Sequence, residues 1–201
     1  MQLNAADGGN RRSISVQIPQ KLKDTGNDFK ANNVALELGY KTICEIGEER
    51  IRRAGKKIKE ETGADIDYGF RVFHVDSSNM EDVYYRPSDY TQEQLSLYAD
   101  NIKPDRTPED LLFQVMLDLG VLLSSKIKEE EIAGKNVFSV ENGYLIACFD
   151  NNVTEETVTE IAKRHPFYAV FRDSGLASDS VAVNFEQIFE TYSPKTQRKV
   201  L

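Results

Sequence analysis

A helix flanked by two strand-like segments in the first 75 residues constrains the fold more than any other feature. Residues 42–62 place isoleucine and alanine at helical spacing, with glutamates early and lysines late, the order that a helix dipole favours. Residues 13–18 alternate apolar and polar side chains before Pro19, and residues 68–75 are rich in aromatic and β-branched types. A strand, a helix and a strand in this order normally form a right-handed parallel crossover. We therefore expect a piece of a doubly wound sheet here.

The second half of the chain carries its own alternation of strand and helix signals. Residues 107–110 read Thr-Pro-Glu-Asp, a capping pattern that precedes an apolar helical face. Asn142-Gly143 stands between two apolar runs, 137–140 and 144–149, which predicts a β-hairpin. Further segments predict a helix at 154–164, a strand at 167–172 and a closing helix at 178–192.

Together these elements predict an α/β chain with two parts. The first is an incomplete Rossmann-like sheet of strand, helix and strand, and the second is a small α/β C-terminal domain with a β-hairpin. We place the domains at 1–80 and 107–201, joined by a polar linker region, 81–106, that contains Pro87 and Pro104. Residues 21–39 are expected to form a surface loop. An incomplete parallel sheet exposes an edge, so the N-terminal half is expected to be unstable or to associate when expressed alone.

Composition excludes several functional classes. The chain has 33 acidic and 25 basic residues among 201, a net charge of −8, so any contact with DNA must be local. No apolar run approaches the roughly 18 residues that span a bilayer, and the N-terminus lacks the pattern of a signal peptide, which predicts a cytoplasmic protein without membrane contact. Cys44 and Cys148 are far apart in the sequence and are expected to be free thiols, with Cys148 buried.

Residues with catalytic potential are sparse. His74 and His165 are the two histidines, and no HExxH, CxxC or GxSxG spacing is present, so we expect neither a metal site nor a catalytic residue. Asp173 and Ser174 follow a predicted strand, where a nucleophile could lie. Because no motif base accompanies them, an independent hydrolase is the weaker interpretation, and turn or cap residues are the simpler one.

A basic stripe marks the predicted helix. Residues 50–59 contain six bases and no acid: Arg50, Arg52, Arg53, Lys56, Lys57 and Lys59. Such a stripe could neutralise DNA phosphates. Bases near the C-terminal end of a helix are also favoured by its dipole, and glutamates flank this stripe, so a solvated helix face is the alternative.

Gln20 occupies a position of interest after the first predicted strand. In dinucleotide-type folds, an acidic side chain at the end of the second strand accepts hydrogen bonds from the ribose hydroxyls. A neutral amide still accepts such a bond but loses its charge-assisted part. Gln20 is therefore a weak candidate for cofactor binding.

Several segments, in order, resemble one family. They are Met-Gln-Leu-Asn at 1–4, Asp-Gly-Gly-Asn-Arg-Arg at 7–12, Val-Gln-Ile-Pro at 16–19, and the segments 39–54, 76–79, 143–150 and 171–189. They resemble the C-terminal part of the Mod subunit of type III restriction-modification systems. Members of that family are adenine-specific DNA methyltransferases that use S-adenosylmethionine.

The resemblance implies one function for the complete Mod enzyme and a more limited function for this chain. The family's DPPY-type catalytic motif and FxGSGTT-type cofactor loop do not occur in this sequence, and Gln20 stands where the family usually has an acid. The chain is therefore expected to be a truncated or split C-terminal portion that is inactive and binds no S-adenosylmethionine alone. Its implied partners are DNA through the complete enzyme, a Mod homodimer and the restriction subunit Res. The alternative is a non-catalytic interaction module that binds Mod or Res.

Overall fold

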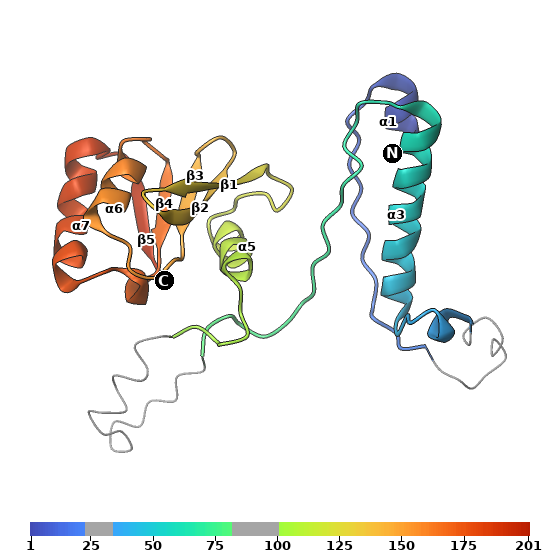
Figure 1. The fold of residues 1–201 in the computed structure, drawn as a ribbon, viewed down its shortest axis with the longest axis horizontal. Helices are drawn as coiled ribbons and strands as arrows, with labels where there is room; N and C mark the ends of the chain where they lie inside the picture. Colours follow the sequence, from blue (N-terminus) through green and yellow to red (C-terminus); the bar gives the residue numbers. More distant parts are fainter. Residues whose placement is uncertain (23–33, 82–100) are drawn as a thin grey trace, which may run out of the picture. The chain divides into compact units, whose positions relative to one another are not determined.

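The computed structural model describes residues 1–22, 34–81 and 101–201, which divide into two compact units, Met1–Val75 and Asp76–Leu201 (Figure 1). We call them the N-terminal and C-terminal units. Most of the predicted loop at 21–39 and of the predicted linker at 81–106 lies outside the described residues. The division at Val75 is a property of the structure, whereas the functional domain limits at 80 and 107 stay a prediction.

A five-stranded mixed sheet in sequential order forms the centre of the C-terminal unit. Its strands are β1 (Ile127–Ile132), β2 (Lys135–Val140), β3 (Leu145–Cys148), β4 (Tyr168–Phe171) and β5 (Gln197–Val200). The first three are antiparallel neighbours and the last three are parallel neighbours. The predicted hairpin is confirmed, since Val140 lies opposite Leu145 and both Asn142 and Gly143 have positive φ, 56° and 92°. The edge strands β1 and β5 were not predicted.

Helices cover both faces of this sheet. The helices α6 (Glu155–Ala162) and α7 (Asp179–Tyr192) pack on one face, against Ile146 and Phe171, in one hydrophobic core. The helix α5 (Pro108–Asp118) packs on the other face, against Leu145 and Val170, in a second core. Adjacent residues of β3 and β4 thus enter opposite cores, as expected for strands with two buried faces. All three predicted helices are confirmed.

The predicted cap of α5 is also present. The Thr107 hydroxyl accepts a hydrogen bond from the Asp110 backbone N–H at 3.3 Å, and the Asp110 carboxylate accepts one from the Thr107 N–H at 2.8 Å. These two bonds form a capping box that satisfies two otherwise unpaired N–H groups. The Thr107 backbone and hydroxyl donors lower the pKa of Asp110.

In the N-terminal unit, the helix prediction is confirmed and the two strand predictions are wrong. The helix α3 spans Ile43–Thr62, capped by Thr42 and ended by Gly63 in the left-handed region. Residues 13–18 and 68–75 are extended but pair into no sheet. Both segments run alongside α3 in the direction opposite to it (Figure 1), which is the arrangement of a strand-helix-strand crossover. The two segments are not joined by the backbone hydrogen bonds of a sheet. No Rossmann-like sheet forms among the residues that the structure describes.

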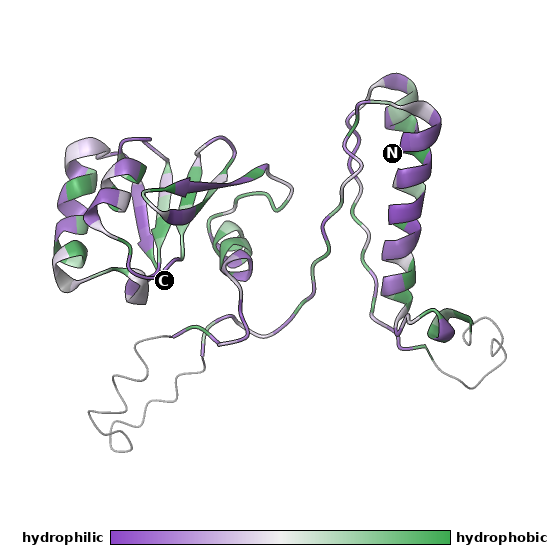
Figure 2. Cartoon of the chain, viewed as in Figure 1, coloured by the Kyte–Doolittle hydropathy of each residue, from purple (hydrophilic) through white to green (hydrophobic). Residues whose placement is uncertain are grey.

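The apolar side chains of these extended segments are left in solvent. Ile14 is 93% exposed and Val16 is 92% exposed, and Val72 and Val75 are also exposed. Figure 2 shows green apolar positions along both segments, while α3 is mostly hydrophilic. An alternating pattern decides which side chains share a face, but a strand needs a neighbouring backbone, and none of the described residues supplies one.

The helix α1 (Gln2–Asp7) was not predicted from the sequence. Gly8 ends this helix in the left-handed region, with φ 67°. The buried Asn4 side chain bonds both the backbone N–H and the backbone carbonyl of Arg11 at 3.1 Å, which ties α1 to the first extended segment. Among the described residues, no helix is both long and apolar enough to cross a membrane.

Candidate nucleic-acid interface

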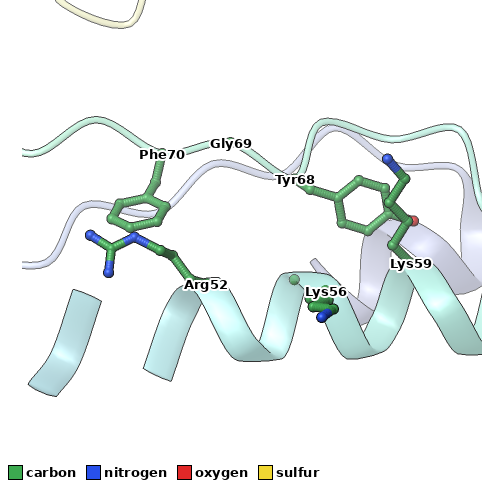
Figure 3. Close-up of a pocket in the computed structure, with 7 residues that line it drawn as sticks. Arg52, Lys56, Lys59, Tyr68, Gly69 and Phe70 are labelled. Carbon is green, nitrogen blue, oxygen red and sulfur yellow. The ribbon is translucent and has the colours of Figure 1, made fainter. Parts of the chain in front are cut away.

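A groove between α3 and the second extended segment gathers basic and aromatic side chains. It has a volume of about 400 Å³ and is lined by Arg52, Gly55, Lys56, Lys59, Tyr68, Gly69 and Phe70. The three bases are spaced four and three residues apart, so they lie on one face of the helix. Tyr68 and Phe70 are two residues apart in extended chain and therefore point to the same side. We call this feature the α3 groove (Figure 3).

Two glycines shape the α3 groove. Gly55 is buried, and a Cβ there would lie 3.3 Å from the Met1 Sδ and 3.6 Å from the Tyr68 carbonyl oxygen. The absence of a side chain therefore lets α3 approach both Met1 and the extended segment closely. Gly69 separates the two aromatic residues, so the space between the rings in Figure 3 is bounded by backbone.

The aromatic residues are held in place by specific contacts. The Arg52 guanidinium lies 5.7 Å from the centre of the Phe70 ring, within the range of a cation–π interaction. The Tyr68 hydroxyl donates a hydrogen bond to the Ala64 carbonyl oxygen at 2.7 Å. In Figure 3 the two rings lie along the extended segment, with Arg52 beneath Phe70, Lys59 beside Tyr68 and Lys56 on the helix below them.

The bases of α3 differ in how far they are already neutralised. Glu49 accepts hydrogen bonds from Arg53 at 2.7 Å and from Arg52 at 3.2 Å, and these two guanidinium groups lower the pKa of Glu49. Lys56 and Lys57 make longer contacts, 3.9 Å to Glu60 and 3.6 Å to Glu61 respectively. Exposed ion pairs of this kind are worth little and are easily exchanged for another anion.

The remaining two bases of the stripe, Arg50 and Lys59, form no ion pair with any residue that the structure describes. The structure brings Arg52, Lys56 and Lys59 to the α3 groove, whereas Arg50, Arg53 and Lys57 do not line it. Their role in DNA binding stays a prediction. The aromatic partners of the bases were missed, although the spacing of Tyr68 and Phe70 was visible in the sequence.

Charge is distributed unevenly between the two units. Residues 1–75 contain 13 bases and 11 acids, a net charge of +2, whereas residues 76–201 contain 12 bases and 22 acids, a net charge of −10. The α3 groove therefore lies in the half of the chain that does not repel a polyanion.

Comparison with known proteins shows a partial relation to one of them. The chain is 40% identical over 74 residues to the type III restriction-modification enzyme StyLTI Mod subunit of Salmonella typhimurium (strain LT2). The match covers 36% of this chain and 10% of that protein, so the chain spans about a tenth of the length of its relative. No family model matches the chain. The comparison supports a partial relation to Mod subunits.

The structure shows the backbone contacts of Gln20, the weak candidate for cofactor binding. Gln20 is exposed, and its described hydrogen bonds come from the backbone: its N–H donates to Ile18 at 2.7 Å, and its carbonyl accepts from the Ile43 N–H at 3.1 Å. Ribose binding by Gln20 stays a prediction.

The other polar candidates show no catalytic arrangement. Asp173 and Ser174 lie in a short 3₁₀ turn, η2 (Asp173–Gly175), where the Ser174 hydroxyl accepts a hydrogen bond from the Arg172 Nε at 2.8 Å. The turn lies close against the Asp150 backbone, because a Cβ on Gly175 would lie 2.7 Å from the Asp150 carbonyl oxygen. No group of three or more His, Cys, Asp or Glu side chains in the described part of the chain could hold a metal ion.

Proposed function

We propose that the chain is a component of a Mod-type, S-adenosylmethionine-dependent, adenine-specific DNA methyltransferase. The observation that carries the proposal is the 40% identity over 74 residues to a Mod subunit. In this function the α3 bases contact nucleic acid, and the C-terminal unit contacts a Mod or Res subunit. The net charge of +2 on the N-terminal unit and of −10 on the C-terminal unit supports this division of roles.

The groups that perform methyl transfer belong, in this proposal, to other residues than those of this chain. Such enzymes turn the target base out of the duplex and hold it against the cofactor with positioned hydrogen bonds. The sequence has neither a DPPY-type nor an FxGSGTT-type motif. Residues 1–201 alone therefore transfer no methyl group.

Complementation tests this function directly. The chain is coexpressed with a Mod subunit from which the segment homologous to the chain has been deleted, and adenine methylation of cellular DNA is measured. We expect methylation to return when the chain is present and to stay absent when either component is expressed alone. Failure to restore methylation, with both components folded, contradicts the proposal.

A non-catalytic interaction module is the second candidate. It is favoured by the C-terminal unit, which has two hydrophobic cores of its own and a stacked, partly exposed aromatic pair, Tyr144 and Phe167, with ring centres 5.1 Å apart. Exposed aromatic residues are enriched in protein interfaces. This candidate predicts that the tagged chain copurifies with Mod or Res while adenine methylation is unchanged, and absence of association with both removes it.

A further inference from the structure

The α3 groove has the composition of a surface that binds unstacked bases. Single-stranded nucleic acid is held by a positively charged groove along its backbone and by aromatic rings on which bases stack. Arg52, Lys56 and Lys59 supply the charge, and Tyr68 and Phe70 supply the rings. No acidic residue lines the α3 groove.

The position of the rings favours a base over a small anion. Phe70 is 37% exposed, and the two rings stand apart along the α3 groove, with a space between them that is bounded by the Gly69 backbone. A flat base can enter this space and contact a ring, while its phosphates reach the ammonium groups of Lys56 and Lys59. A small anion would use the lysines and leave the rings without a role.

We propose that the α3 groove binds single-stranded nucleic acid, with a base against Phe70 or Tyr68 and phosphates on Lys56 and Lys59. The inference rests on the proposed function in one respect, the assignment of nucleic acid as the ligand of α3, and it adds that the strand is single. In a duplex the bases are stacked on one another, so their faces are not available to these rings.

Lys56 is the position that tests the charge contribution, because the neighbouring residue is a matched control. Lys56 and Lys57 are the same residue type, are 79% and 74% exposed, and each faces a glutamate four residues later. Lys56 lines the α3 groove and Lys57 does not. We measure the fluorescence anisotropy of a labelled 12-nucleotide thymidine strand titrated with residues 1–201, over a range of salt concentrations.

K56Q is expected to weaken binding and to reduce the slope of log affinity against log salt by about 0.7, the value for one lost contact with a single strand. K57Q is expected to leave the affinity and the salt slope nearly unchanged. Equal effects of the two variants would show that only the overall charge matters and would overturn the α3 groove as the site.

Phe70 tests the aromatic contribution. F70L keeps an apolar side chain but removes the ring, and we expect a loss of affinity of about 5-fold to 150-fold, equivalent to about 1–3 kcal/mol for one stacked base. The control is F73L, since Phe73 lies on the same extended segment but does not line the α3 groove. Circular dichroism of each variant reports whether α3 has formed.

The strand specificity separates this inference from the proposed function. We expect the single strand to bind about tenfold or more tightly than a duplex of equal length, because each accessible base adds stacking energy. Equal or tighter duplex binding, or no binding at low salt, overturns the inference. Single-strand binding without complementation of methylation contradicts only the proposed function, and complementation by F70L and K56Q at the parent level contradicts only the α3 groove.

Discussion

The two units of this chain contain similar local patterns with opposite outcomes. In the C-terminal unit, Ile146 and Ala147 on adjacent positions of β3 are both buried, because α6 and α7 cover one face and α5 covers the other. In the N-terminal unit, Ile14 and Val16 alternate as a strand should, yet both are more than 90% exposed. The pattern specifies the face that a side chain would share, and the neighbouring elements decide whether that face is buried.

This difference has a thermodynamic consequence. Burial of a large aliphatic side chain stabilises a fold by about 1.5–3 kcal/mol, and an extended segment that buries nothing must still lose backbone entropy of about 1–2 kcal/mol per residue. Residues 13–18 therefore have little that favours a single conformation in the chain alone. The C-terminal unit contains both hydrophobic cores. We therefore expect it to account for most of the free energy of unfolding.

Amide hydrogen exchange should show the largest contrast between the units. Amides of β3 and β4 exchange only when the sheet opens, so we expect them to be protected by about a thousandfold or more relative to residues 13–16, which donate no described backbone hydrogen bond. Mass spectrometry of exchanged peptides measures both regions in one sample. Comparable protection of the two regions in the isolated chain would mean that residues 13–16 form backbone hydrogen bonds in solution. That result would contradict the contrast between the two units.

Much of the C-terminal fold could be predicted because its signals are local. The capping residues 107–110 and Asn142-Gly143 act within a few residues of themselves, and the structure confirms both. The edge strands were missed for a physical reason: β1 reads Ile-Lys-Glu-Glu-Glu-Ile and β5 reads Gln-Arg-Lys-Val. Each is hydrogen-bonded on one side alone, so charged side chains are tolerated and the apolar signal is weak.

The candidate site was predicted in part. The stripe at 50–59 is a local property of one helix and was visible, and the structure places three of its bases, Arg52, Lys56 and Lys59, in the α3 groove. The contribution of Tyr68 and Phe70 depends on the return of the chain along α3, which is a tertiary event. Gln20 was selected from a Rossmann-like arrangement that the described residues do not form.

The two cysteines provide a second contrast, one in each unit. Burial raises the pKa of Cys148 to about 11, so at pH 8 about one thiol in a thousand is ionised, and the thiolate is the reactive form. Cys44 is only partly buried. We expect a thiol reagent such as dithionitrobenzoate to modify one cysteine per chain rapidly and the second only on unfolding, with peptide mapping to identify Cys44.

Cys148 also carries a pH dependence with a defined sign. The folded state disfavours the thiolate, so between the ordinary pKa near 9 and the raised value of about 11 the unfolded state releases the proton first, and stability falls as pH rises. The variant C148A is expected to flatten this alkaline loss. Rapid labelling of Cys148 at pH 8 in the folded chain would contradict its burial.

A phenylalanine in each unit gives a smaller, quantitative contrast. Phe171 of β4 is fully buried against Phe185 and Phe189, so F171A is expected to lower the free energy of unfolding by about 3–5 kcal/mol. Phe73 is 49% exposed, so F73A should lower the free energy of unfolding by less, about 1 kcal/mol. Urea unfolding followed by circular dichroism compares the two variants, and equal losses would show that residues 68–75 pack as tightly as the sheet.

The smallest expected effect concerns the cap of α5 and distinguishes a local signal from a tertiary one. T107A removes the hydroxyl that accepts from the Asp110 N–H and should cost about 1 kcal/mol at pH 7, while T107S keeps the hydroxyl and should cost less. The pKa of Asp110 is lowered in the fold, so the contribution of the cap is complete above the ordinary carboxylate pKa and is lost as pH falls through the lowered value. The difference between T107A and the parent should therefore shrink in acid. A difference that is constant from pH 7 into acid would mean that the Asp110 carboxylate takes no part, and that Thr107 stabilises α5 only through the hydrogen bond that its hydroxyl accepts from the Asp110 N–H.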